Sequence, residues 1–393
     1  MRVKKLGLLV LSIALATTIW LPTLHVLFRP NEEELTQEGV SPRARALATR
    51  HLGLWEDAGA LSSTLKQMRV NNPEWDFMGR TFLVLALANM AERDPESRPR
   101  LLAVIDRIVA DTLRLERERG QPYFLMSYAS HRPWVAQPPR SLFVDGEIAL
   151  MLAARCLVED RPDYHAGLAD RVRVMSARMQ ANPKTLSAES YPDECWAFCN
   201  AVALAAIRIG DRVLGQDHSA FLAAWISNAK QNLVHKETGL LVSKYTLSGE
   251  VGDGPEGSSI WMALHCLWIV DEAFARDQYE RARLELGKTL LGFGYAREWP
   301  VSWANHSDVD SGPIVPYLEA SAGSSGLALL GAATAGDRDY QASLIASLDL
   351  AAFPLTDSQG GLRYGAGSQV GDAVLLYSLV CGPLWEKLPA KSP

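Results

Sequence analysis

Hydrophobic residues recur at helical spacing through most of this 393-residue chain, and this pattern constrains the fold more than any other feature. Turn-forming stretches such as Asn71–Pro73 and Gly252–Gly257 separate the apolar segments. Strand-like sequence is confined to a hairpin pattern at Gly239–Glu250. The chain is therefore predicted to be all-α, with about twelve helices. These are expected at Ala44–Arg69, Glu74–Arg93, Arg98–Arg119, Ser141–Glu159, Tyr164–Gln180, Asp193–Leu214, Ser219–Leu233, Ser258–Phe274, Asp277–Phe293, Ala320–Ala335, Asp337–Leu350 and Gly371–Trp385.

The connections between these helices alternate between short and long, which favours six antiparallel helix pairs. A helical solenoid is the competing arrangement, but the sequence shows no fixed repeat period. If the pairs close into a barrel, the long connections collect at one end. Because loops held by a rigid scaffold commonly carry function, a site is expected at that end.

The N-terminus predicts a membrane anchor. Residues 1–5 form a basic flank with Arg2, Lys4 and Lys5, and residues 6–28 form an uncharged apolar run long enough to cross a bilayer. The basic flank predicts a cytoplasmic N-terminus, so the rest of the chain would lie in the periplasm, attached to the inner membrane. Ala14–Ala16 is the alternative, a signal-peptidase site, but the apolar run continues past it. Residues 29–43 read as a linker and residues 44–393 as the barrel domain.

Composition excludes some classes of function. The net charge is −6 without a basic block, so nucleic acid is not an expected partner. Five cysteines do not make a dense disulfide framework. There is no HExxH motif, paired CxxC, GxGxxG or P-loop, so neither zinc nor a nucleotide cofactor is expected. Eleven tryptophans are many, and tryptophan often lines pockets for apolar or sugar ligands.

One acidic loop resembles a calcium-binding loop in part. Asp308 and Asp310 alternate as EF-hand ligands do, and Glu319 falls at the twelfth position from Asp308. However, Gly312 occupies the fifth position and offers no side-chain oxygen. Pro313 occupies the sixth, where the sharp turn needs glycine. The sequence therefore predicts no metal site.

The central stretch Ser190–Asn200 combines an acid, two thiols and an aromatic ring at the start of an apolar helix. Pro192 suits a first helical turn, and Asp193 suits the positive end of the helix dipole. Cys195 and Cys199 are four residues apart, which would place both thiols on one helix face. The alternative is a capped core helix with two buried cysteines.

This stretch resembles the linalool dehydratase/isomerase family of bacteria, through Pro192-Asp193 followed by Cys199-Asn200 and a helix of small apolar residues. Leu233–Gly249 and Asp271–Tyr279 are also similar to that family, over roughly residues 142–377. The resemblance implies an (α/α)6 barrel, a ring-shaped homo-oligomer, and acid/base chemistry on an alcohol without metal or cofactor.

The resemblance also assigns roles to individual residues. Cys199 matches the cysteine of the family's Cys-Asn pair, whereas Ser190 stands in place of a second cysteine and Glu147 in place of a histidine. These changes move the site towards carboxylate chemistry, which needs a buried acid with a raised pKa. Such an acid also suits a glycosidase.

Four segments would meet at the end of the barrel that carries the long connections: Asn72–Asp76, Asp145–Glu147, the stretch around Asp193, and Trp299–Pro313. Glu147, Asp193 and Cys199 would surround one enclosed chamber. The predicted catalytic residues are Glu147, Asp193, Cys199, Asp308 and Asp310, and the predicted substrate-binding residues are Trp75, Asp76, Ser190, Tyr191, Trp196, Trp303 and His306.

Three functions remain open. The first is a linalool dehydratase/isomerase-like hydro-lyase or isomerase acting on a small-molecule alcohol. The second is a glycoside hydrolase or polysaccharide lyase that uses paired carboxylates on an oligosaccharide. The third is a periplasmic binding protein that keeps the barrel without the chemistry. A buried, perturbed Glu147 would favour an enzyme over a binding protein.

Overall fold

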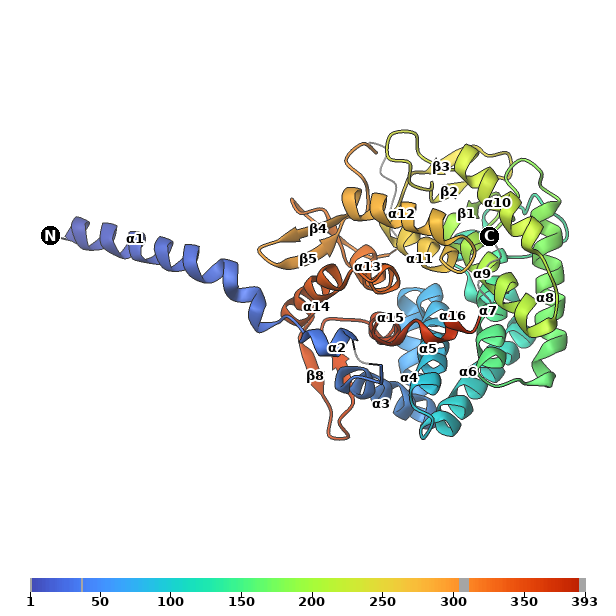
Figure 1. Cartoon of the computed structure of the whole chain (residues 1–393), viewed down its shortest axis with the longest axis horizontal. Coiled ribbons are helices and arrows are strands. Elements are labelled where there is room, and N and C mark those ends of the chain that lie inside the picture. Colours follow the sequence, from blue (N-terminus) through green and yellow to red (C-terminus); the bar gives the residue numbers. More distant parts are fainter. Residues whose placement is uncertain (1, 37, 304–310, 389–393) are drawn as a thin grey trace.

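A computed structural model describes residues 2–36, 38–303 and 311–388. Within these residues, six helices form an inner ring in which each helix packs against the next and the last packs against the first (Figure 1). The ring consists of α5 (Pro73–Arg93), α7 (Leu142–Val158), α9 (Ala197–Leu214), α11 (Gly257–Leu267), α13 (Ala322–Ala335) and α15 (Gln369–Val380). Helices α7 and α9 are buried on nearly every side, because they are covered by neighbours in the ring and by an outer layer.

The outer layer alternates with the inner ring along the chain. It consists of α3 (Pro42–Glu56), α6 (Arg98–Arg119), α8 (Pro162–Gln180), α10 (Ser219–Asn232), α12 (Glu272–Glu285) and α14 (Arg338–Ala352). These helices are amphipathic, as α6 shows by burying leucines, isoleucines and valines while exposing its charged residues. The predicted all-α (α/α)6 barrel is confirmed. Helices α4 (Ala58–Asn71) and α16 (Pro383–Glu386) are additions to the two rings.

Connections of very different length join the two rings. Those leaving the inner helices are short, as residues 94–97 and 336–337 show. Those entering the inner helices are longer and lie at the N-terminal end of the ring, notably residues 120–141, 181–196, 233–256, 286–321 and 353–368. These longer connections also contain the described strands, β1 (Cys195–Trp196), β2 (Lys244–Tyr245), β3 (Val251–Asp253), β4 (Gly287–Leu290), β5 (Phe293–Ala296), β6 (Ile314–Val315), β7 (Ala320–Ser321), β8 (Pro354–Thr356) and β9 (Leu362–Tyr364).

Strand pairing moves several helix ends away from their predicted positions. Helix α9 begins at Ala197 and not at Asp193, because Cys195 and Trp196 pair with β2 in a three-stranded sheet. Cys195 therefore does not share a helix with Cys199, and Pro192 lies in a turn. The predicted helix Asp277–Phe293 is instead α12 followed by the β4–β5 hairpin.

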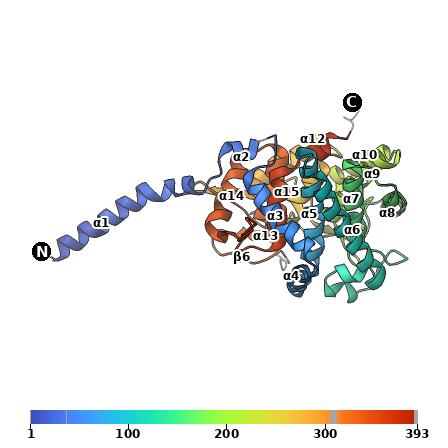
Figure 2. The same cartoon turned by 90° about the horizontal axis from the view of Figure 1, so that it is seen from below.

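The N-terminal segment projects away from the barrel as α1 (Arg2–Trp20) and the 3-10 helix η1 (Leu21–Leu27), as Figures 1 and 2 show. Lys4–Leu27 has a mean hydropathy of 1.9, and none of it is buried against the domain. Among the described helices it alone is long and apolar enough to span a membrane. The short helix α2 (Glu32–Thr36) then leads towards α3.

Two glycines on the ring helices test how closely the ring is packed. A Cβ on Gly257, at the start of α11, would lie 2.1 Å from Ser324 Oγ and 2.6 Å from the Arg297 carbonyl oxygen. A Cβ on Gly326, inside α13, would meet nothing within 4 Å. We therefore expect Gly257→Ala to lower the free energy of unfolding by about 1–3 kcal/mol through overpacking.

Gly326→Ala is the matched control, and we expect it to raise the free energy of unfolding by about 0.5–1 kcal/mol because alanine favours a helix. Denaturant titrations followed by circular dichroism would measure both changes. Equal effects of the two variants would contradict the close approach of α11 to α13.

Candidate active site

Glu147 is a buried carboxyl group with a strongly raised pKa at the N-terminal end of the inner ring, where Asp372 in the first turn of α15 is another. Glu147 lies in the second turn of α7 and is 1% exposed. Its Oε2 atom has no hydrogen-bond partner among the described residues. Burial raises the pKa of this carboxyl to about 8; the Thr81 side chain opposes that shift, and the charge of Glu74 adds to it. Glu147 is therefore a neutral acid at neutral pH.

Glu74 provides a second carboxyl group in a different environment. It lies in the first turn of α5, where its backbone N–H donates to Asn72 Oδ1 at 2.8 Å. It is only partly buried. The hydroxyl of Tyr191 donates a hydrogen bond to Glu74 Oε1 and accepts one from the Met126 N–H at 2.9 Å. The Tyr191 hydroxyl therefore holds one oxygen of the Glu74 carboxyl in place, whereas Glu147 Oε2 has no such partner among the described residues.

Cys199 joins this pair from the first turn of α9. Burial raises the pKa of its thiol well above the ordinary value; the side chain of Ser190 opposes that shift, and the carboxyls of Glu74 and Glu147 add to it. Ser190 is itself fully buried. The thiol is therefore neutral and cannot act as a thiolate nucleophile in this setting.

Asp193 lies in a strained turn outside this group. Its φ of 59° is in the left-handed region, which a non-glycine residue adopts at some energetic cost. The turn is held by the buried Glu189, whose Oε1 accepts a hydrogen bond from the Asp193 N–H at 2.7 Å. Asp193 acts electrostatically on the thiol of Cys195, whereas the carboxylate that acts on Glu147 is that of Glu74. Glu147 thus acts on the thiol of Cys199, whereas Asp193 acts on that of Cys195.

Glu189 was not anticipated from the sequence, and its role is to hold the backbone. Its two carboxylate oxygens also accept hydrogen bonds from the N–H groups of Val135, at 3.0 Å, and Ala136, at 2.8 Å. It therefore fastens the 120–141 connection to the turn before α9. No sequence motif marked it, because the contact joins two loops about fifty residues apart.

The remaining predicted residues are dispersed. Asp76 is buried in ion pairs with Arg80, at 2.9 Å, and Arg69, at 3.4 Å. Trp196 donates from Nε1 to Glu194 Oε2 at 3.1 Å, and Trp303 packs edge-on against His235 with ring centroids 5.5 Å apart. Trp75 is half-buried at the start of α5. His306, Asp308 and Asp310 lie outside the described residues.

Two tyrosines stack on each other next to Glu74. Tyr191 stacks on Tyr128 with ring centroids 4.6 Å apart and an interplanar angle of 19°. A cavity of about 150 Å³ lies elsewhere, between α6 and α8, and a water-sized cavity lies beside His51. Neither is lined by Glu147, Asp193 or Cys199, so neither is the enclosed chamber expected from the sequence.

Asp145 shows how differently a nearby carboxylate can be used. It is two residues from Glu147 on the same helix but forms ion pairs at 2.5 Å with both Arg140 and Arg171. Gln121 Nε2 also donates to Asp145 Oδ1 at 3.1 Å. These contacts fasten α7 to α8 and to the 120–141 connection, so Asp145 has a structural role.

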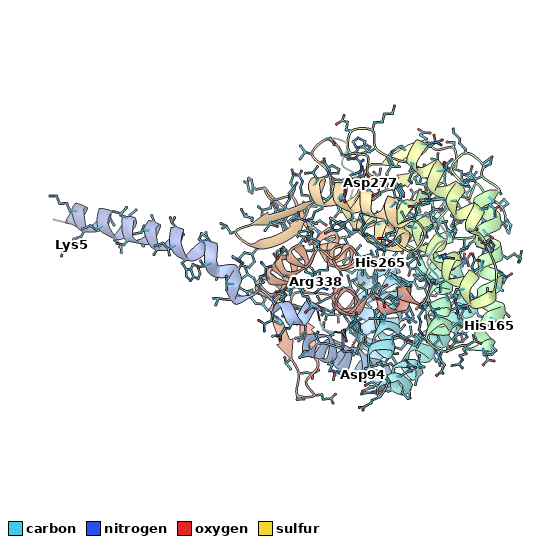
Figure 3. All side chains as sticks on the ribbon, viewed as in Figure 1. Lys5, Asp94, His165, His265, Asp277 and Arg338 are labelled. Carbon is cyan, nitrogen blue, oxygen red and sulfur yellow. The ribbon has the colours of Figure 1, made fainter. Side chains whose placement is uncertain are left out.

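A group of potential metal ligands lies at the opposite end of the barrel. Cys156, Asp160 and His165 each bring one ligand atom within 4.8 Å of the others. His165 lies at the rim of the domain on α8, whereas His265 is buried near the centre (Figure 3). His165 Nε2 already pairs with Asp160 at 2.6 Å, and the Cys156 thiol donates to the Arg161 carbonyl oxygen at 3.7 Å. These contacts account for the three side chains without an ion.

No protein-family model matches the chain. Two solved structures are similar to it across most of their length. The unsaturated glucuronyl hydrolase of Bacillus sp. GL1, described as responsible for the degradation of glycosaminoglycan, has a TM-score of 0.51 at 13% identity. A variant of UGL with dGlcA-Glc-Rha-Glc has a TM-score of 0.52, also at 13% identity. Each likeness covers 79% of this chain and 86% of the other, and at this identity it establishes a shared fold.

The expected membership of the linalool dehydratase/isomerase family is wrong, and so is the hydro-lyase or isomerase activity that it implied. The similar solved structures are of sugar-cleaving enzymes. The motif residues also have local structural explanations. The Asn200 side chain accepts from the Ala188 N–H at 3.1 Å and donates to the Trp196 carbonyl oxygen at 2.9 Å, which fixes the start of α9. A Cys-Asn pair is thus a poor marker of the chemistry here.

The raised pKa of Glu147 predicts a pH-dependent stability. Because the folded state holds this proton up to about pH 8 and the unfolded state releases it near 4.5, folding stability falls as the pH rises between those values. The neutral amide of Glu147→Gln removes this dependence. We expect the variant to gain stability relative to the wild type as the pH rises towards 8, by on the order of a few kcal/mol. Thermal unfolding at several pH values measures this gain, and its absence would contradict the desolvated acid.

Asp145→Ala should lower the stability of the protein, whereas Glu147→Gln should raise it at high pH. Removing this carboxylate leaves the buried Arg171 with only Glu116 as a charged partner. We expect a loss of about 3–5 kcal/mol in the free energy of unfolding at neutral pH. Denaturant titration beside Glu147→Gln would separate the two roles, and a neutral effect of Asp145→Ala would contradict the structural assignment.

Proposed function

We propose that this chain is a glycoside hydrolase whose substrate is an oligosaccharide, with Glu147 as the general acid and Glu74 as the partner carboxylate. The observation that carries the proposal is the contrast between two neighbouring carboxyl groups. One is buried and neutral, and the other is partly exposed and hydrogen-bonded by a tyrosine. Such a divergence of environments assigns acid and base roles in carboxylate enzymes. The shared fold with glucuronyl hydrolase is consistent with this activity.

The proposed reaction needs no cofactor. Glu147 gives its proton to the glycosidic oxygen as the bond from that oxygen to the anomeric carbon breaks. Glu74 accepts a proton from a water molecule, whose oxygen forms the new bond to the anomeric carbon. In total, one glycosidic bond is broken and one water molecule is consumed, so that each of the two sugar products carries a new hydroxyl group. A later proton transfer from Glu74 to Glu147 through solvent restores the starting state.

Substrate must reach a site that is now covered. Glu147 is 1% exposed, and Tyr191, which stacks on Tyr128, bonds the carboxylate of Glu74, so in this proposal the 120–141 connection moves before a sugar contacts Glu147. Glu189 restrains this connection at Val135 and Ala136. In this proposal Cys199 and Ser190 are neutral neighbours that position the substrate. Trp75 and Trp196 are proposed to contact it as it enters.

We also propose that the barrel is held at the inner membrane, with its domain in the periplasm. The apolar span Lys4–Leu27 supports an anchor, and the basic residues before it support a cytoplasmic N-terminus. A membrane-attached hydrolase would act on oligosaccharides that have entered the periplasm.

The activity is tested with a panel of oligosaccharides, including unsaturated uronic acid derivatives, on the full-length chain. We expect Glu147→Gln to lose at least about 10²-fold in kcat, because general acid catalysis is typically worth that much. The wild-type rate should fall as the pH rises through about 8, where Glu147 loses its proton. Glu280→Gln, on the exposed face of the outer helix α12, is the control that should keep full activity.

The products distinguish the alternatives. A hydrolase incorporates oxygen from isotopically labelled water, whereas a polysaccharide lyase leaves a double bond without it. Full activity in Glu147→Gln would overturn the assigned acid. Oligosaccharide binding without turnover by the wild type would favour a binding protein.

A further inference from the structure

We infer that the tip of the β4–β5 hairpin is a membrane-docking element that sits in the lipid interface beside the N-terminal anchor. The tip consists of Leu290, Leu291 and Gly292. The inference rests on the proposed membrane anchor and is independent of the proposed hydrolase activity. In Figure 1 this hairpin points towards the side of the domain from which α1 departs.

The hairpin contacts the segment where the apolar span ends. Phe293, directly after the tip, lies with its ring centroid 6.2 Å from that of His25 and 6.2 Å from that of Phe28. The approach at Gly292 is so close that a Cβ there would lie 2.1 Å from the His25 ring. Because Lys4–Leu27 is long enough to cross a bilayer core of about 30 Å, residues at its end lie near the outer lipid interface. The tip therefore lies at the same depth.

The turn carries an unusual residue for a hairpin in water. Leu291 and Gly292 form its two central positions and have φ values of 51° and 82°. Two-residue turns with positive φ at both positions favour Asn-Gly or Asp-Gly. Leucine is strained there and forgoes the local hydrogen bonds of asparagine. A lipid contact would offset that strain.

The apolar side chains at the tip are also exposed. Leu290 is 48% exposed and Leu291 is 42% exposed. Leu284, at the end of α12, is 72% exposed. Lys288 lies on the same hairpin, and its Nζ donates to the Leu284 carbonyl oxygen at 2.7 Å. Exposed leucines beside a cationic group suit the boundary between acyl chains and anionic headgroups.

The occupant of this surface is a phospholipid bilayer, and the test measures depth directly. The full-length chain carries Cys381→Ser, because Cys381 is the only cysteine that is not fully buried. A spin label is placed on Leu290→Cys, and a control label on Val251→Cys in β3, a 44%-exposed apolar residue in another sheet. Each protein is reconstituted in vesicles of phosphatidylcholine and phosphatidylglycerol. Collision with oxygen, which partitions into lipid, is compared with collision with a water-soluble nickel complex.

We expect the label at position 290 to show a higher ratio of oxygen to nickel accessibility than the label at position 251. Adding Leu291→Asn should lower that ratio towards the control, because asparagine suits the left-handed turn but not lipid. A ratio at 290 equal to that at 251, in protein that floats with the vesicles, would overturn the inference.

Two other outcomes are separable. If the protein does not float with the vesicles, the proposed anchor is wrong, and the docking inference fails with it. The proposed hydrolase activity is tested separately, by the loss of sugar cleavage in Glu147→Gln. The label at position 290 could instead be shielded from both reagents and show dipolar coupling to the label of a second copy. This result would mean that the tip packs on another molecule. That result would also overturn the inference.

Discussion

The packing of α15 on α5 closes the inner ring, and the rest of the structure depends on that closure. If the ring were open, water could reach the side of each inner helix that faces the centre of the ring. A closed ring surrounds these helices on both sides, so an ionisable group on them loses its hydration. Glu147 is therefore neutral, whereas Asp145, two residues earlier, keeps two arginines as partners. The fold thus decides which carboxyl is an acid and which is a structural ion.

Periodicity predicted most of the architecture. The helical pattern predicted about twelve helices, and the alternating connection lengths favoured six antiparallel pairs with the long connections at one end. Closure of these pairs into two rings was implied by the resemblance to the linalool dehydratase/isomerase family, so the fold was right although the family was wrong. The helical pattern did not predict the strands that move the start of α9 to Ala197, since pairing with Lys244 and Tyr245 is a contact between distant segments. The enclosed chamber expected around Glu147, Asp193 and Cys199 is neither of the two cavities described above, and it stays a prediction.

The candidate site was predicted in part. The sequence identified Glu147 and Cys199, whose burial follows from their place on apolar helices. It favoured Asp193 over Glu74, because Asp193 stands in a motif that resembled the linalool dehydratase/isomerase family. The contact of Tyr191 with Glu74 is the reason that the proposed mechanism uses Glu74 as the second carboxylate. The short Cys-Asn motif suggested the wrong family. The hydrogen bonds of Asn200 at the start of α9 give this residue a structural role instead. Asp308 and Asp310 lie outside the described residues and stay predictions.

The acid role of Glu147 requires that its carboxyl keeps its proton at neutral pH. Difference infrared spectra of the wild type against Glu147→Gln would follow the carbonyl band of that single protonated carboxyl across a pH titration. We expect a band that persists until the pH reaches about 8. Disappearance of the band near 4.5, the ordinary value for a glutamate, would contradict it.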